Sequence, residues 1–350
     1  MKLSTTRRPA ARRSVRVAAA VAASTLLFAA CTNSSDGDDS GVANAGGEND
    51  ESGDTVTIGF SAPAADHGWM GAISEAAVAQ AEQYDDIELV NAEGTNDVNL
   101  QISQVETFIN DGVDAIVLLP FDGAAMTEVA QKAMDAGIQV VNVDREFNAP
   151  AAARTTVLGD NYGMGRSAGE YVCEQADGNE DAVVAEIAGI DSLPLTQDRS
   201  EGFEDALKTC GLEVDNRVAA EFTVESGETA ASNLLQAAPQ IDFLWNHDDD
   251  QGVGVMAAIE NAGRDEFVMI GGAGSANVMR AIQEDDSVIK ATVIYPSTQA
   301  ADGIKLARLL VQGKAMSDLA EVEVPRTVQL AAPVVTKDNV EEFMDSAFES

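Results

Sequence analysis

The sequence has 350 residues, with 59 Asp and Glu against 21 Lys and Arg, a formal charge of −38, 45% hydrophobic residues and three cysteines. This length suits two domains better than one core. The charge excludes nucleic acid as a partner, because phosphate binding depends on Lys and Arg neutralising the backbone charge. The apolar content is that of a globular protein.

The first 30 residues have the pattern of an export signal. They contain six of the 21 cationic residues and none of the acidic ones, so their removal would change the charge from −38 to −44. A basic start, an apolar run over 17–30 and small residues before Cys31 are typical of a secretory signal peptide. The apolar run is too short to span a bilayer comfortably as a permanent helix. We therefore expect residues 1–30 to be removed on export.

Residues 31–54 differ in composition from the rest of the chain. They are mainly Asp, Gly, Ser, Asn and Glu, with almost nothing apolar to bury. Such a segment cannot bury enough surface to fold. It predicts a disordered acidic tether with a root-mean-square span of about 25 Å.

From residue 55 onward, short β-branched runs alternate with segments of helical period. This alternation predicts parallel sheets with helices on both faces. Continuously apolar strands such as 115–119 are typical of sheets buried on both sides. About ten strands favour two sheets of about five strands over one very wide sheet. The predicted strands are 56–60, 87–91, 115–119, 139–143, 155–158, 182–187, 218–222, 243–245, 268–271 and 290–294, and the predicted helices include 97–110, 124–136, 164–175, 229–237, 251–261 and 298–310.

Aromatic, carboxylate and guanidinium side chains follow several predicted strands, where ligands bind in parallel sheets. They include His67 and Trp69 after the first strand, Asp144-Arg145 after the fourth, and the run 248–250 after strand 243–245. A sugar offers an apolar C–H face to aromatic rings and hydroxyls to carboxylate and guanidinium groups. These strand ends therefore predict a carbohydrate site. For residues 248–250, capping of the next helix is an equal alternative.

The residues around Cys31 resemble a bacterial lipobox, Leu27-Phe28-Ala29-Ala30-Cys31, although Phe28 stands where an aliphatic residue is usual. This resemblance implies that Cys31 is lipidated and becomes the mature N-terminus. The chain would then be anchored to the outer face of the cell membrane, in the periplasm or cell envelope.

Segments 58–60, 66–69, 111–117, 143–145 and 159–161 together resemble the type I periplasmic sugar-binding proteins, above all the ribose-binding branch that serves ATP-powered importers. The resemblance implies an α/β fold of two doubly wound parallel-sheet lobes, joined by a three-segment hinge, with the ligand between them. The crossings would fall near 158–160, 295–297 and 324–326. The N-terminal lobe would comprise 55–158 plus 297–325, and the C-terminal lobe 159–296 plus 326–350.

Carried over position by position, the resemblance implies a set of ligand-binding residues, with Trp69 stacking on the sugar. Three departures argue against ribose itself: Gln197 stands where the family often has arginine, Tyr295 replaces a polar amide, and glycine follows strand 268–271 where an aspartate is common. The implied ligand-binding residues are His67, Trp69, Asp144, Arg145, Asn161, Gln197, Phe222, Asp248 and Tyr295.

Two cysteines remain after Cys31. Cys173 lies near the end of the predicted helix 164–175, and Cys210 follows a helical segment at 201–209. Because exported proteins meet oxidising surroundings, we predict a Cys173–Cys210 disulfide.

Motifs for cofactors are weak. Gly163 to Gly169 resembles a dinucleotide loop, but its third glycine is one residue late and it lies in a predicted helix. With two histidines and separated cysteines, a zinc cluster is not expected either. We predict no cofactor and no metal.

Three classes of function compete for this sequence. The first is an extracytoplasmic, monomeric lipoprotein that delivers a monosaccharide or related polyol to the permease of an ABC transporter; a sensory protein for a nucleoside or autoinducer is its variant. A transcription regulator of the same fold would need a DNA-binding head, where this chain has a signal peptide and a tether. An enzyme would need a nucleophile, a base and an orienting group at the strand ends, which are not found. We therefore expect a binding protein and not an enzyme.

Overall fold

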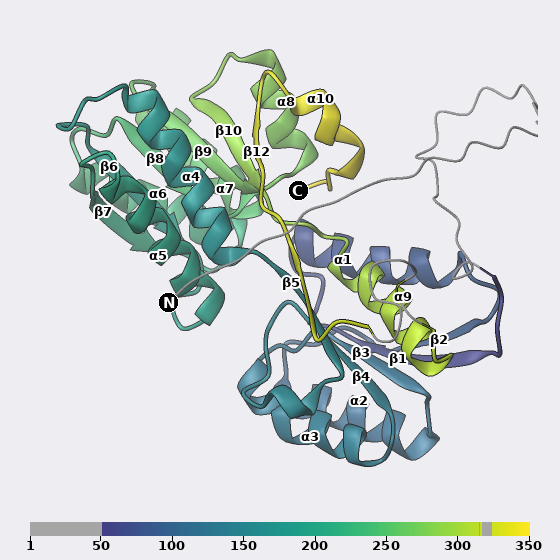
Figure 1. Cartoon of the computed structure of the whole chain (residues 1–350). Helices are drawn as coiled ribbons and strands as arrows, with labels where there is room; N and C mark the ends of the chain where they lie inside the picture. Colours follow the sequence, from purple (N-terminus) through teal and green to yellow (C-terminus); the bar gives the residue numbers. More distant parts are fainter. Residues whose placement is uncertain (1–50, 315, 317–323) are drawn as a thin grey trace, which may run out of the picture. The chain divides into compact units, whose positions relative to one another are not determined.

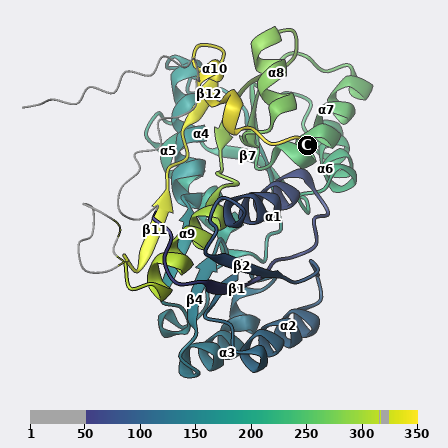
Figure 2. The same cartoon turned by 90° about the vertical axis from the view of Figure 1, so that its right-hand side faces the viewer.

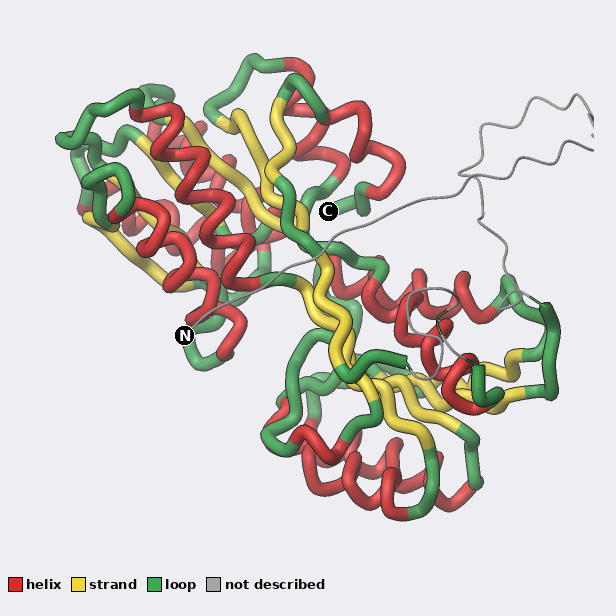
Figure 3. Tube along the Cα trace, viewed as in Figure 1, coloured by secondary structure: helices red, strands yellow, loops and turns green. Residues whose placement is uncertain are grey.

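Two six-stranded sheets are formed by the residues that the computed structural model describes, which are 51–314, 316 and 324–350. The first sheet has the order β11-β5-β4-β3-β1-β2 and the second β12-β10-β9-β8-β6-β7. Paired strands are parallel except β12, which runs antiparallel to β10. Helices flank each sheet (Figures 1 and 3). The predicted fold class is confirmed, whereas the predicted signal peptide, Cys31 and the tether up to residue 50 lie outside the described residues.

The first lobe is built around the first sheet. Ile116 and Leu118 of β3 pack with helices α2 and α3, while Val117 faces the core that contains α1 and α9, because successive strand residues point to opposite faces. This alternation explains why every residue of the strand is apolar. The elements are β1 (Val56–Ser61), α1 (Gly68–Ala81), β2 (Ile87–Asn91), α2 (Val98–Asp111), β3 (Ala115–Leu118), α3 (Gly123–Asp135), β4 (Gln139–Val143), a 3-10 turn (Pro150–Ala152), β5 (Thr155–Gly159), α9 (Gln299–Val311) and β11 (Thr327–Leu330).

The second lobe repeats this plan. Ala185 and Ile187 of β6 pack with α6 and α7, while Val184 joins a core with α4 and α5. In that core, the rings of Trp245 and Phe203 lie 4.7 Å apart. The elements are α4 (Asn161–Ala176), β6 (Val184–Ala188), α5 (Pro194–Lys208), β7 (Val214–Ala219), α6 (Val224–Ala237), β8 (Phe243–Asn246), α7 (Asp249–Ala262), β9 (Val268–Ala273), α8 (Ala276–Glu284), β10 (Ile289–Ile294), β12 (Val334–Thr336), α10 (Val340–Phe343) and a final 3-10 turn (Met344–Ser346).

The chain passes between the two sheets three times. It leaves the first sheet at the end of β5 and returns between β10 and α9, close to the first two predicted crossings. The third crossing was expected at 324–326, and this position is wrong. Because β11 pairs with β5, the chain stays in the first sheet to Leu330 and crosses at 331–333 before β12 (Figure 2).

The predicted strand 218–222 is wrong. β7 ends at Ala219, and Phe222 has a φ of 63°, a left-handed conformation that cannot continue a strand.

The glycines of the 163–169 motif allow two helices to pack closely. A Cβ on Gly165 would collide with the backbone of Arg199 on α5, and one on Gly169 would crowd Ala206. This close approach of two helices accounts for the motif without a nucleotide.

Residues 51–54 were expected to belong to the tether, but they bind the first lobe. The buried Arg308 donates from Nε and Nη2 to the Asp86 carboxylate, each at 2.7 Å, and from Nη2 to the carbonyl of Glu51 at 2.8 Å. The backbone N–H of Gly53 also donates to Asp86, at 2.6 Å. The hydrogen bonds from Arg308 hold the pKa of Asp86 well below its usual range. The ordered part of the chain therefore begins before residue 55.

In the second lobe, Cys173 and Cys210 form a disulfide with their Cα atoms 5.8 Å apart. It joins α4 to the turn that follows α5.

Among the described helices, none is long and apolar enough to cross a bilayer.

Candidate functional site

Strand ends from both lobes meet around one small cavity. Its volume is about 30 Å³, close to the share of one molecule in liquid water. The segments that follow β1, β4, β8 and β10 all reach it. Seven of the nine residues predicted to bind the ligand line this cavity: His67, Trp69, Asp144, Arg145, Phe222, Asp248 and Tyr295.

The other two predicted residues lie outside this cavity. Asn161 sits beside it, where its Nδ2 donates to the Tyr295 hydroxyl at 3.1 Å and its Oδ1 accepts from Nε of Arg199 at 2.9 Å. Gln197 is exposed and donates to the carbonyl of Asp191 at 3.1 Å. The structure therefore does not bring Gln197 to the cavity.

Three lining residues were not among those predicted: Met70, Leu195 and Arg199. The guanidinium of Arg199 lies 4.5 Å from the centre of the Tyr295 ring and donates from Nη1 to the carbonyl of His247 at 3.2 Å. Arg199 thus brings to the cavity, two residues later on α5, the cation that the family often has at the position of Gln197. The signal was present in the sequence as the arginine nearest that position.

Asp144 occupies a strained turn at the end of β4. Its φ is 64°, and the N–H of Arg145 donates across the turn to the carbonyl of Val143 at 2.7 Å. Few residues other than glycine adopt this conformation, and such strain gathers at functional sites. The side chain of Asn142 supports the turn by donating to the carbonyl of Arg145 at 3.0 Å. The turn holds the Asp144 carboxylate at the cavity, buried and 3.7 Å from Nε of Arg145.

Tyr295 enters the cavity from the second crossing segment. Its hydroxyl donates to Oδ1 of Asp144 at 2.5 Å. Burial, reinforced by the charge of Asp144, raises the pKa of Tyr295 above its usual range, so the hydroxyl stays protonated as a donor. A Cβ at position 159 would collide with this ring, which explains why β5 ends in Gly159. Tyr295 therefore takes one of the acceptor oxygens that a ligand hydroxyl would use.

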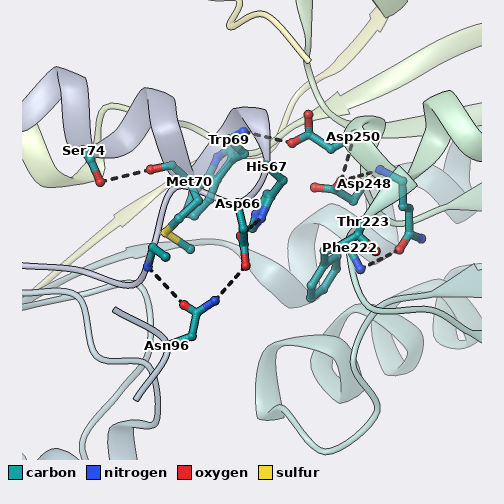
Figure 4. Close-up of polar contacts among 12 residues, drawn as sticks. Asp66, His67, Trp69, Met70, Ser74, Asn96, Phe222, Thr223, Asp248 and Asp250 are labelled. Carbon is teal, nitrogen blue, oxygen red and sulfur yellow. Dashed lines mark hydrogen bonds and ion pairs between the residues drawn. The ribbon is translucent and has the colours of Figure 1, made fainter. Parts of the chain in front are cut away.

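Trp69, the residue that the resemblance places against the sugar, lies in the interior of the structure. It is buried in the first turn of α1, where its indole Nε1 donates to the carbonyl of Tyr295 at 3.0 Å. Its backbone N–H donates to Oδ2 of Asp250 at 2.9 Å (Figure 4). The two rings, of Trp69 and Tyr295, lie 5.4 Å apart. Trp69 thus links the first lobe to Tyr295 in the second crossing and to Asp250 in the second lobe.

His67 precedes α1 on the rim of the same cavity. Its Nδ1 lies 2.6 Å from Oδ1 of Asp66, and Oδ2 of Asp66 accepts from Asn96 at 2.8 Å. Figure 4 shows this chain of polar side chains beside Trp69, facing Asp248 and Phe222. The imidazole is therefore oriented by its own lobe while it faces the other.

Asp248 both caps a helix and lines the cavity, so the two alternatives for this residue coexist. Its Oδ1 accepts from the N–H groups of Asp250 and Gln251 at 2.9 and 3.1 Å, at the start of α7. Burial and the nearby charge of Asp250 raise the pKa of Asp248 to about 7, although the charge of His67 acts in the opposite direction. Asp248 can therefore change its charge near neutral pH.

Asp249 faces away from the cavity and supports a loop. Its carboxylate accepts from the N–H groups of Gly272, Gly274 and Ser275 at 2.7–3.0 Å, and from the hydroxyl of Thr292 at 3.1 Å. Burial nevertheless raises the pKa of Asp249 to about 7. These contacts fix the glycine-rich segment after β9, where the family often has an aspartate.

Comparison with known proteins places this geometry in a family. The model of a periplasmic binding protein domain matches residues 58–315. The chain belongs to the periplasmic binding proteins. It is 30% identical over 243 residues to a D-ribose/D-allose-binding protein of Pseudomonas aeruginosa, covering 67% of this chain and 75% of that protein. It is also 30% identical to a ribose import binding protein of Bacillus subtilis, covering 62% and 72% of the two chains.

A solved structure supports the same assignment. An ABC transporter solute binding protein from Bacillus halodurans, with bound myo-inositol, superimposes with a TM-score of 0.73 at 26% identity and covers 84% of this chain and 98% of its own. Periplasmic binding proteins bind solutes and are not enzymes. In the described ranges of this periplasmic binding protein, no cluster of three or more His, Cys, Asp or Glu side chains is arranged to hold a metal ion.

Proposed function

We propose that this periplasmic binding protein captures a monosaccharide or related polyol between its two lobes, outside the cytoplasm, and delivers it to the permease of an ABC transporter. The observation that carries the proposal is the cavity where both lobes place aromatic, carboxylate and guanidinium groups together. The relatives named for ribose, allose and myo-inositol support a polyhydroxylated ligand.

The lining groups suit hydroxyl recognition. The carboxylates of Asp144 and Asp248 accept hydrogen bonds, while the guanidinium groups of Arg145 and Arg199 donate them. Phe222, with Trp69 and Tyr295, offers ring faces for C–H groups. The lining combines acidic and basic groups with no large excess of either, so a neutral ligand is favoured over an ion.

Binding requires the lobes to separate. A space of about 30 Å³ holds one water and no sugar, so the ligand enters only when the contacts of Trp69 with Asp250 and Tyr295 open. The three crossing segments then act as the hinge. The ligand shifts the equilibrium toward a closed state because only that state contacts it from both lobes. The permease recognises the closed state, and no reaction is performed on the ligand.

The remaining features of the proposal concern location and state. Residues 1–30 direct export, Cys31 carries the lipid, and the acidic segment after it tethers the body to the outer face of the membrane. The protein acts as a monomer without a cofactor. Its lobes comprise 55–158 with 297–330 and 159–296 with 331–350.

Titration calorimetry against pentoses, hexoses, deoxysugars and polyols tests this function. Each charged hydrogen bond is worth about 1.5–3 kcal/mol, so Asp144→Ala should weaken binding at least about tenfold. Trp69→Ala should do the same by removing a ring face and a closing contact. Gln197→Ala is the matched control, since Gln197 lies outside the cavity, and it should bind as the wild type does. If nucleosides or peptides bind and none of the carbohydrates and polyols does, the proposal is wrong.

A further inference from the structure

A second, larger cavity adjoins the one described above. Its volume is about 440 Å³, within the range of about 300–1,000 Å³ that is usual for small-molecule sites. The two cavities share Asp144, Arg145 and Leu195 in their walls. The strained turn at Asp144 is thus a partition between a water-sized space and a ligand-sized one.

Both lobes contribute to the larger cavity. The first lobe supplies the start of α3, with Ala124, and the segment after β4, with Glu146 and Asn148. The second lobe supplies the first residues of α4 and the start of α5, including Asp198. A molecule bound there would therefore touch both lobes and would favour closure, as a ligand of the smaller cavity would.

The walls of the larger cavity select a class of molecule. Carboxylates of Asp122, Glu146 and Asp198 outnumber the one guanidinium, of Arg145, which already donates to the carbonyl of Phe121 at 2.8 Å. An anion would be repelled by this balance. The carboxylates can accept hydrogen bonds from hydroxyls, and the amide of Asn148 can both donate and accept them. An apolar wall is formed by Leu158, Leu193, Pro194 and Leu195.

We infer that this larger cavity is a preformed second subsite, so that the cleft takes a ligand of two joined units, a disaccharide or a glycoside. One unit binds at Trp69, Asp144 and Asp248 when the lobes separate, and the second lies against α3 and α5. The inference rests on the proposed function and extends it from one sugar unit to two.

Calorimetry with matched probes tests the inference. The single-unit probes are D-ribose, D-galactose, D-glucose and myo-inositol, and the two-unit probes are lactose, melibiose and galactosyl-myo-inositol. A two-unit probe should bind at least about tenfold more tightly than either of its component units. Ala124→Trp fills the larger cavity and should remove this advantage, lowering the affinity for the two-unit probe to that for a single unit.

Ala125→Trp is the control, because Ala125 lies on the same exposed turn of α3 and does not line the cavity. It should keep the tenfold preference, and the melting temperatures of both variants should match. The inference is overturned if single-unit probes bind while every two-unit probe binds no better, or if both tryptophan variants lose the same affinity. Failure of every probe, single or double, overturns the proposed function and the inference with it.

Discussion

The segments after β4 and β8 each carry a buried carboxylate at the end of a strand, yet the partners of the two carboxylates differ. Asp144, after β4, receives its hydrogen bond from Tyr295, which belongs to a crossing segment. Asp249, after β8, receives all its hydrogen bonds from its own lobe. Asp249 is therefore tied to the fold of its own lobe, whereas Asp144 can exchange the Tyr295 hydroxyl for a ligand hydroxyl. For these two residues, the origin of the partner separates a structural acid from a binding one.

The largest expected effect is on Asp249. Asp249→Ala leaves three buried N–H groups and the Thr292 hydroxyl without an acceptor, at about 1–3 kcal/mol for each group that stays unsatisfied. We expect a loss of about 4 kcal/mol in the free energy of unfolding, measured by denaturant titration. Asp144→Ala should lower the free energy of unfolding by about 1 kcal/mol. It removes the acceptor of one hydroxyl, that of Tyr295, and leaves no buried backbone N–H without a partner. Equal losses in the two variants would contradict the distinction.

The pH dependence of stability gives a smaller effect. The pKa of Asp248 is about 7 in the folded chain and near 4 when unfolded, so the native state holds an extra proton between pH 4 and 7. Its contribution is present at acid pH and is lost as the pH rises through 7, with a slope of up to about 1.4 kcal/mol per pH unit.

Asp248→Asn should flatten the decline in unfolding free energy between pH 4 and 7, measured by urea titration at each pH. Part of the slope should remain, since burial raises the pKa of Asp249 in the same direction. Asp265→Asn, on an exposed turn after α7, serves as the control and should keep the full slope. An Asp248→Asn variant that keeps the full wild-type slope would show that Asp248 holds no extra proton over this range.

The smallest effect is expected at Tyr295. Tyr295→Phe removes the hydroxyl that occupies Oδ1 of Asp144, at a cost of about 1 kcal/mol in stability. The freed oxygen should then accept a ligand hydroxyl, and the affinity for the best single sugar should rise by about fivefold in calorimetry. Tyr171→Phe, at a half-buried tyrosine of the second lobe that does not line the cleft, should leave the affinity unchanged. A fall in affinity for Tyr295→Phe would show that the hydroxyl itself holds the ligand.

The alternation of strands and helices could be predicted from the sequence because it is a local pattern. The short strands β11 and β12 could not, since β11 alternates exposed and half-buried residues at a sheet edge and its place depends on pairing with β5. The position of the third crossing follows from that pairing. For the same reason the pattern at 218–222 misled, because the turn at Phe222 depends on backbone conformation rather than on hydrophobicity.

The residues of the candidate site also differ in how far the sequence predicts them. Asp144 and Arg145 could be found because they directly follow a buried strand. Arg199 was not predicted to bind the ligand, because its place at the cavity depends on the close packing of α5 on α4. The three consecutive acids at 248–250 look alike in the sequence, yet one lines the cavity, one holds a loop and one meets Trp69. Only their neighbours in space separate these roles.

The ion pair between Asp86 and Arg308 has a mechanical consequence. Because Glu51 and Gly53 are held at this pair, tension on the preceding chain enters the first lobe there. Neither partner belongs to a segment that crosses between the sheets. A force applied to the chain before residue 51 would therefore enter the first lobe without passing through the three crossing segments.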